Sequence, residues 1–277
     1  MKYKLFSYNY SDTVIHHMSG ITKLACFLLL TFGVMFSYDL RYILVVLVFS
    51  FSLLKISRIK LKQIRVMLIY VGIFLLTNFI ITYLFSPEQG VEIYGTRHEI
   101  ARIAGNYTLT KEQLLYQITK LFKYCSAIPC GIVFLLTTDP SEFASSLNGV
   151  GIGYKTSYAV SLTLRYFPDV QRDYHNISQS LQARGLEMTK KAKLLDRFKN
   201  IISVLMPLIF SSLGKVETIS NAMDLRGFGK KKKRTWYRKQ PLKKRDYIAL
   251  FICITLFLSS LAISAFVNGS RYYNPFR

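Results

Sequence analysis

The stretch VMLIYVGIFLLTNFIITYLF, Val66 to Phe85, is long and apolar enough to cross a membrane as a single helix, which takes about 20 residues. Tyr247 to Val267 is a second stretch of this kind. Shorter apolar stretches run from Leu24 to Phe36, Tyr42 to Leu54 and Leu121 to Leu136, and they span a bilayer only if their polar flanks lie among the headgroups. One short stretch alone fits a buried helix of a soluble protein. Five in one chain predict an all-α, polytopic membrane protein with about five transmembrane helices.

The composition supports a separation of apolar from basic segments. The 277 residues are 51% hydrophobic, yet the chain carries a net charge of +22. Such a charge also fits a nucleic-acid-binding protein. However, the densest basic block, Lys230 to Arg234, lies shortly before the last apolar stretch, where basic residues typically face anionic lipid. We therefore expect this protein to contact the lipid bilayer and not nucleic acid.

The distribution of Lys and Arg predicts the orientation, because cytoplasmic loops retain positive charge. The connection 55–65 is basic throughout, whereas acids and bases balance in 86–111. The segment from Asp139 to Asp246 holds 21 Lys and Arg against 9 Asp and Glu. We expect a multi-pass protein of the cell membrane with its N-terminus in the cytoplasm, its C-terminus outside and this long segment cytoplasmic.

Three regions follow from this topology. Residues 1–137 form an N-terminal membrane region of four spans, residues 138–246 a cytoplasmic region of helices, and residues 247–277 a C-terminal span with an external tail. Ile201 to Phe210, within the cytoplasmic region, is apolar but short. We interpret it as an interfacial or buried helix rather than a sixth span.

A long helix is predicted from Thr156 to Met188, with a break at Pro168 because proline removes a backbone donor and clashes with the preceding turn. After the break, Arg184 lies on the same helical face as apolar residues. The same arrangement recurs at Arg226. The two apolar stripes are Ile177, Leu181 and Met188 in the first helix and Val216, Ile219 and Met223 in the second.

Glycine follows the arginine in both places, as Gly185 and Gly227. Glycine adopts the left-handed conformation that ends many helices, so each helix is predicted to end at its arginine. A solvated arginine favoured by the helix dipole is the simpler interpretation of either position alone. The duplication favours a docking surface, because a guanidinium among apolar residues pairs bidentately with a carboxylate in a partner's groove.

Four short segments in chain order carry a family resemblance. Residues 16–24, HHMSGITKL, are similar to a His-x-Leu-Asp-Pro-Arg-x-Lys-Leu element, although Ser-Gly-Ile replaces Asp-Pro-Arg. Residues 135–143, LLTTDPSEF, contain a Thr-Thr element, and residues 162–168, LTLRYFP, are similar to Leu-x-Leu-Arg-Phe-x-Pro. The most specific pair is QARG at 182–185 and AMDLRGFG at 222–229, two motifs of the Ala-Arg-Gly type.

In these segments the chain resembles the transmembrane coupling (T) component of energy-coupling factor transporters, the CbiQ/EcfT family. The resemblance implies a subunit of an ABC importer for a vitamin or metal ion, with two ABC-type ATPase subunits and a membrane-embedded S component as partners. It implies ATPase-coupling roles for Ala183, Arg184, Gly185, Ala222, Arg226 and Gly227, and supporting roles for Arg165, Pro168, Thr137, Thr138 and Lys23.

Catalytic signatures such as HExxH, GxSxG or paired catalytic carboxylates do not stand out in the sequence, and the cysteines lack metal-ligand spacing. We expect a non-catalytic subunit without cofactor or metal, whose partners hydrolyse ATP. One alternative is an integral membrane enzyme acting on lipids, with Asp139, Glu142, Asp169 and Asp173 as its acidic candidates. A secondary transporter is another, but the paired repeats and intramembrane charges typical of that class are not evident.

Overall fold

The computed structural model describes residues 13–59, 61–104, 107–186, 194–231, 235–236 and 240–275. The chain packs as two compact units, the first formed by Met1–Asp139 with Gln240–Arg277 and the second by Pro140–Lys239. Met188 and most of the basic block Lys230 to Arg234 lie outside the described residues.

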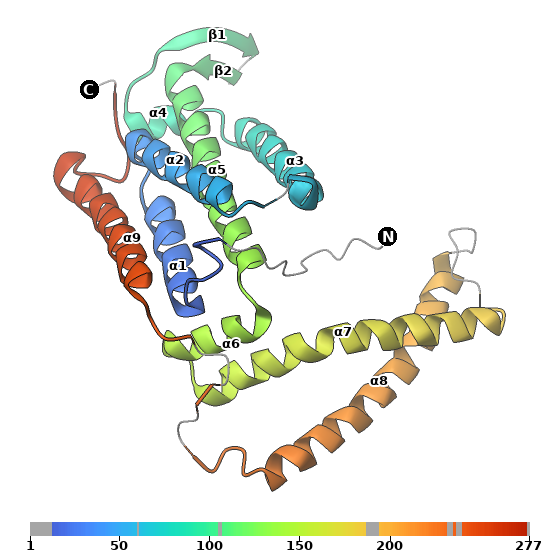
Figure 1. Ribbon diagram of the computed structural model, residues 1–277. Coiled ribbons are helices and arrows are strands. Elements are labelled where there is room, and N and C mark those ends of the chain that lie inside the picture. Colours follow the sequence, from blue (N-terminus) through green and yellow to red (C-terminus); the bar gives the residue numbers. More distant parts are fainter. Residues whose placement is uncertain are drawn as a thin grey trace. The chain divides into compact units, whose positions relative to one another are not determined.

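The first unit is a bundle of long helices (Figure 1). Helix α1 packs against α9, and α2 packs against α5. A short helix and a two-stranded antiparallel hairpin connect α3 to α5. The elements are α1 (Gly20–Phe36), α2 (Leu40–Ile56), α3 (Leu61–Phe85), α4 (Gln89–Tyr94), β1 (Glu99–Ala104), β2 (Tyr107–Thr110), α5 (Lys111–Thr137), α9 (Lys244–Ala262) and the π-helical turn η1 (Ile263–Val267).

The second unit contains α6 (Pro140–Gly149), α7 (Tyr154–Ala183) and α8 (Leu194–Leu225). Helix α7 packs against α6 near its start and is crossed by α8 further along (Figure 1). Val204 and Leu208, one helical turn apart, are buried on α8, and Lys215 of α8 pairs with Asp173 of α7. The packing of α8 on α7 and this ion pair join the two long helices.

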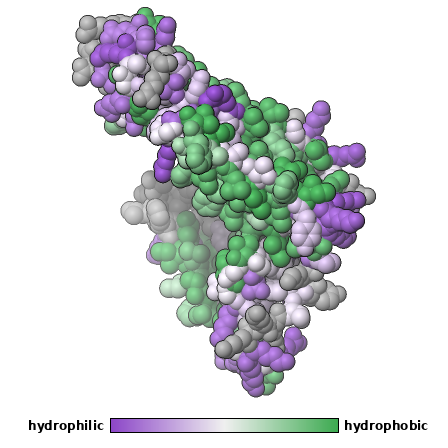
Figure 2. Space-filling view, turned by 90° about the vertical axis from the view of Figure 1, so that its left-hand side faces the viewer, coloured by the Kyte–Doolittle hydropathy of each residue, from purple (hydrophilic) through white to green (hydrophobic). Residues whose placement is uncertain are grey.

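The prediction of an all-α, polytopic membrane protein is confirmed. Four helical segments of the described chain are long and apolar enough to cross a membrane, namely Ile64–Phe85, Lys111–Thr137, Lys199–Leu225 and Lys244–Val267. Hydrophobic side chains cover much of the face in Figure 2, as expected for helices that contact lipid. Two of the three shorter predicted spans correspond to α1 and α2, each of 17 residues, and the third, Leu121 to Leu136, lies within the 27-residue α5.

The segment Lys199–Leu225 contains the run Ile201 to Phe210, which we interpreted as interfacial or buried. In α8 this run continues into a longer apolar helix that meets the length and composition of a span. Ile202, Met206 and Phe210 are exposed on it. Helix α8 therefore carries exposed apolar side chains in addition to those that pack on α7.

The predicted break at Pro168 is wrong, because α7 continues through this residue. Proline lacks a backbone N–H, so one interior hydrogen bond is lost at this exposed position, and the helix continues on both sides of it. Helix α5 likewise continues through Pro129 and α8 through Pro207. The predicted helix end at Met188 is also wrong, since α7 stops at Ala183.

The buried carboxylate of Asp246 joins α9 to the start of α1. One of its oxygens accepts a hydrogen bond from the Lys243 backbone N–H at 2.8 Å, which caps α9. The other oxygen accepts from the Ser19 backbone N–H at 2.9 Å, just before α1. With an exposed fraction of 1%, Asp246 satisfies two backbone donors that have little access to water.

We predict that Asp246→Asn destabilises the first unit. An amide has one accepting oxygen instead of two, so one backbone N–H loses its partner at a cost of about 1–3 kcal/mol. The melting temperature of the protein in detergent, followed by intrinsic fluorescence, should fall. Glu92→Gln, at an exposed position of α4, is the control and should melt like the wild type. Equal melting of Asp246→Asn and wild type would contradict this role.

Candidate functional site

Helix α7 ends in a Schellman motif around Arg184. Gly185 adopts a left-handed φ of 87°, and its N–H donates to the Gln182 carbonyl at 3.0 Å. The Leu186 N–H donates to the Leu181 carbonyl, also at 3.0 Å. Arg184 is therefore the last residue before the chain reverses, as its position beside glycine predicts.

Helix α8 ends in the same motif around Arg226. Gly227 has a φ of 64°, and its N–H donates to the Asp224 carbonyl at 2.9 Å. The Phe228 N–H donates to the Met223 carbonyl at 3.0 Å. The two arginines thus occupy equivalent positions in two copies of one backbone geometry, and the predicted left-handed glycines are confirmed.

Both helix ends present exposed side chains. Ala183 and Arg184 are exposed at the end of α7, as are Ala222 and Arg226 at the end of α8. Leu225, beside the second arginine, has an exposed fraction of 90% and presents apolar surface at this end. An exposed guanidinium beside small or apolar residues can pair with a carboxylate while apolar surface is buried around it.

The apolar stripe of the second helix lies toward α7. Val216, Ile219 and Met223 line a groove of about 310 Å³ together with Tyr166 and Val170 of α7. We predicted that this stripe is buried in a partner's groove. Within the second unit it instead faces α7 in part, whereas Leu225 and Arg226, just after the stripe, are exposed.

An aromatic cluster anchors the segment that follows Arg226. The ring of Phe228 lies 4.8 Å from that of Tyr158 and 5.3 Å from that of Tyr154, both near the start of α7. Trp236 lies 6.4 Å from Tyr158 and donates a 3.1 Å hydrogen bond to the Asn148 side chain of α6. The sequence analysis missed this cluster, although the single tryptophan of the chain, placed in a basic segment, was a possible signal.

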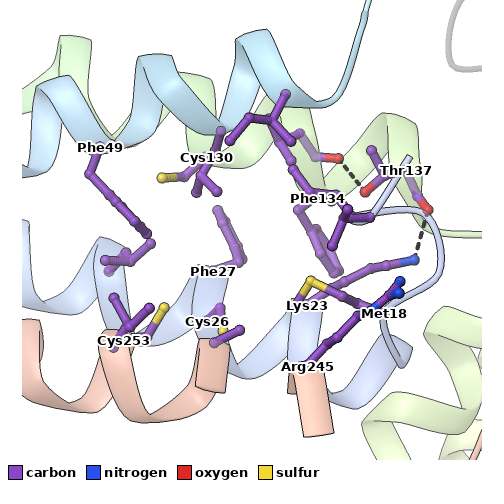
Figure 3. Close-up of a pocket in the computed structure, with 18 of the residues that line it drawn as sticks. Met18, Lys23, Cys26, Phe27, Phe49, Cys130, Phe134, Thr137, Arg245 and Cys253 are labelled. Carbon is purple, nitrogen blue, oxygen red and sulfur yellow. Dashed lines mark hydrogen bonds between the residues drawn. The ribbon is translucent and has the colours of Figure 1, made fainter. Parts of the chain in front are cut away.

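Two of the predicted supporting residues meet in the first unit. The buried Lys23 ammonium donates to the Thr137 carbonyl at 3.0 Å and to the His16 carbonyl at 3.2 Å. Figure 3 shows the first of these bonds. Thr137 is the last residue of α5, so a cation there also complements the helix dipole. Thr138 follows and is buried as well.

Arg165 and Pro168 do not join the two helix ends. Both are exposed in the middle of α7, and Arg165 precedes Arg184 by roughly 28 Å along the helix axis. Arg165 and Pro168 are therefore exposed on α7 but lie apart from its end at Arg184.

The described residues hold no group of three or more His, Cys, Asp or Glu side chains suited to a metal ion. Among the acids considered for a lipid enzyme, Asp169 pairs with Arg172 at 3.1 Å and Asp173 pairs with Lys215. Asp169 is thus engaged in an ion pair within α7, and Asp173 in one between α7 and α8.

Residues 11–237 match the family model of CbiQ, described as a cobalt transport protein. The chain belongs to this family. It is 25% identical to the energy-coupling factor transporter transmembrane protein EcfT of Lactococcus lactis subsp. cremoris over 88% of this chain and 91% of the relative. It is also 25% identical to EcfT of Bacillus selenitireducens (93% and 95%) and 23% identical to EcfT of Streptococcus thermophilus (90% and 94%). The CbiQ/EcfT resemblance seen in the sequence is therefore confirmed.

We predict that Gly185→Ala and Gly227→Ala weaken the two helix ends. A non-glycine residue in the left-handed region costs roughly 1–2 kcal/mol. Hydrogen exchange at the Leu186 and Phe228 amides, which close the two motifs, should accelerate about 5- to 30-fold in the respective variant.

Gly214→Ala is the matched control. Gly214 lies inside α8 with open space around it and without a left-handed φ, so alanine should leave both amides unchanged and favour the helix slightly. Unchanged exchange in the Gly185 and Gly227 variants would show that the motifs do not hold these ends.

Proposed function

We propose that this CbiQ/EcfT-family protein is the coupling subunit of an energy-coupling factor transporter and binds two ABC-type ATPase subunits through Arg184 and Arg226. The observation that carries the proposal is the pair of helix ends with one backbone geometry, each presenting an exposed arginine before a left-handed glycine. Two equivalent ends suit two equivalent grooves, one on each ATPase.

Arginine suits this role because its planar guanidinium pairs bidentately with a carboxylate and is less strongly hydrated than an ammonium. Ala183 and Ala222 have small side chains and allow a close approach of the partner. Leu225 adds apolar surface at the second end, where it is almost fully exposed. Each docked arginine should lie near the centre of a small interface surrounded by apolar contacts.

Helices α7 and α8 are long enough to transmit a movement of the ATPase subunits over a distance. Helix α7 has 30 residues and is roughly 45 Å long, and α8 has 32 residues and crosses it. When ATP draws the two ATPase subunits together, the ends held by them must move relative to one another. The packing of α8 on α7 and the ion pair between Lys215 and Asp173 join the helices, so this motion passes along both.

The apolar surface of α8 is suited to a membrane-embedded S component. Ile202, Met206, Phe210 and Leu213 are exposed on this helix. We place the second unit at the cytoplasmic side of the cell membrane, in agreement with its positive charge. The S component would select a vitamin or a metal ion, and this chain would hydrolyse no ATP itself.

Reversal of the two arginine charges tests the proposal. Arg184→Glu or Arg226→Glu should weaken association with the ATPase subunits at least about 30-fold, because the charge pair is lost and its partner carboxylate is repelled. The double variant should not co-purify with them. The measurement is the ATPase content of the affinity-purified complex together with a titration of the separate components.

Arg172→Glu is the matched control, since Arg172 is an exposed arginine of the same helix α7 away from its end. It should co-purify like the wild type. Normal ATPase binding by the double variant, or equal loss in the control, would rule out docking through these two arginines.

A further inference from the structure

A cleft of about 360 Å³ lies within the first unit, between α1, α2, α5 and α9. We propose that it binds one acyl chain of an anionic phospholipid, with the lipid phosphate at Arg245. This inference depends on the membrane location of the helices and not on ATPase docking.

The cleft is a hydrophobic channel with a basic end. Figure 3 shows Lys23, Arg245, Met18 and Thr137 at one end, whereas Phe49 and Cys253 lie toward the other. The basic end is formed where α1 and α9 begin and where α2 and α5 finish. On the predicted orientation, these four helix ends belong to the cytoplasmic leaflet.

The length of the cleft matches half a bilayer. From Lys23 to Leu30 along α1, and from Arg245 to Cys253 along α9, the lining residues cover roughly 10–12 Å. The hydrocarbon core of one leaflet is about 15 Å thick, half of the full core. A chain that enters at the basic end therefore runs from the headgroup level into the leaflet.

The floor and the rim of the cleft differ in exposure. Leu30, Cys130 and Cys253 are buried at its floor. Ile56 of α2 and Ile248 of α9 line it with exposed fractions of 51% and 60%. The cleft is thus deep between the helices and bordered by side chains that face lipid, which suits an occupant supplied by the bilayer.

Charge at the basic end favours an anionic headgroup. Arg245 is exposed, and its guanidinium fork fits two phosphate oxygens. Lys23 donates to two backbone carbonyls, and from this position its positive charge also attracts an anionic headgroup. Neighbouring Asp246 is negative, but it is buried and its oxygens accept the Ser19 and Lys243 N–H groups.

The lining of the cleft suits a hydrocarbon chain. The residues that line it along α1, α2, α5 and α9 are mostly apolar, and its charged side chains, Lys23 and Arg245, lie together at one end. An acyl chain between the four helices therefore buries apolar surface while its headgroup stays at the basic end.

Native mass spectrometry of the full-length protein tests the proposal. The protein is stripped of lipid in detergent and mixed with equal amounts of dioleoyl phosphatidylglycerol and dioleoyl phosphatidylcholine. The wild type should retain one lipid, with phosphatidylglycerol favoured about fivefold through its interaction with one basic residue. Arg245→Gln should reduce this preference to near one, and Ala249→Phe, which fills the cleft, should abolish retention of both lipids.

Matched variants outside the cleft separate this effect from a general change in the protein. Arg65→Gln removes an exposed charge near the start of α3, and Ala262→Phe adds a ring at an exposed position of α9. Both should retain lipid like the wild type. No retained lipid, equal retention of the two lipids, a retained molecule that is not a phospholipid, or retention by Ala249→Phe would overturn the proposal.

The native cysteines provide a second measurement in case Ala249→Phe does not fold. Cys26 lines the cleft and is partly accessible, whereas Cys125 is partly accessible but lies outside it. Added phosphatidylglycerol should slow maleimide labelling of Cys26 at least fivefold in the wild type and leave Cys125 unchanged. Equal protection of both thiols, or protection of neither, would contradict occupancy of the cleft.

Discussion

A left-handed glycine directly after an arginine ends both long helices of the second unit, and the proposed function depends on this backbone constraint. The Schellman hydrogen bonds fix where each helix stops and therefore where Arg184 and Arg226 project. If either helix continued by one turn, its arginine would lie inside the helix instead of at its exposed end. The second end has an additional anchor, because Phe228 packs on two tyrosines of α7.

A buried polar junction plays a comparable part in the first unit. Lys23 holds the carbonyl end of α5, and Asp246 holds the N–H groups before α1 and at the start of α9. These contacts connect segments far apart in the chain at one end of the bundle. Because backbone groups near a membrane have few alternative partners, such bonds fix the relative positions of the helix ends. The cleft proposed to hold lipid opens at this junction.

Much of the architecture could be predicted because its signals are local. Apolar length predicts the spans, and arginine followed by glycine predicts the two helix ends. Pro168 was misleading, since an exposed proline inside a long helix loses only one hydrogen bond and need not interrupt it. The β1–β2 hairpin was also missed, because β1 lacks an alternation of apolar and polar residues and β2 alternates over only four residues.

Contacts between distant segments were not accessible to the sequence analysis. Neither the bond between Lys23 and Thr137 nor the packing of Phe228 on Tyr158 follows from any periodic pattern. The family resemblance implied supporting roles for Lys23 and Thr137 separately. Their hydrogen bond is evident only in the structure. Similarly, the stripe of Val216, Ile219 and Met223 was recognised as apolar, but its orientation toward α7 depends on how two helices cross.

The central claim is that each arginine-bearing end contacts its own ATPase subunit. The most direct measurement is photo-crosslinking in the assembled transporter from a benzoylphenylalanine placed at Ala183 or at Ala222, with the crosslinked partner identified by mass spectrometry. The account predicts that each position crosslinks to one ATPase subunit, and that a protein carrying both probes crosslinks to two. Crosslinks from both positions to lipid or to the S component, with none to an ATPase subunit, would contradict it.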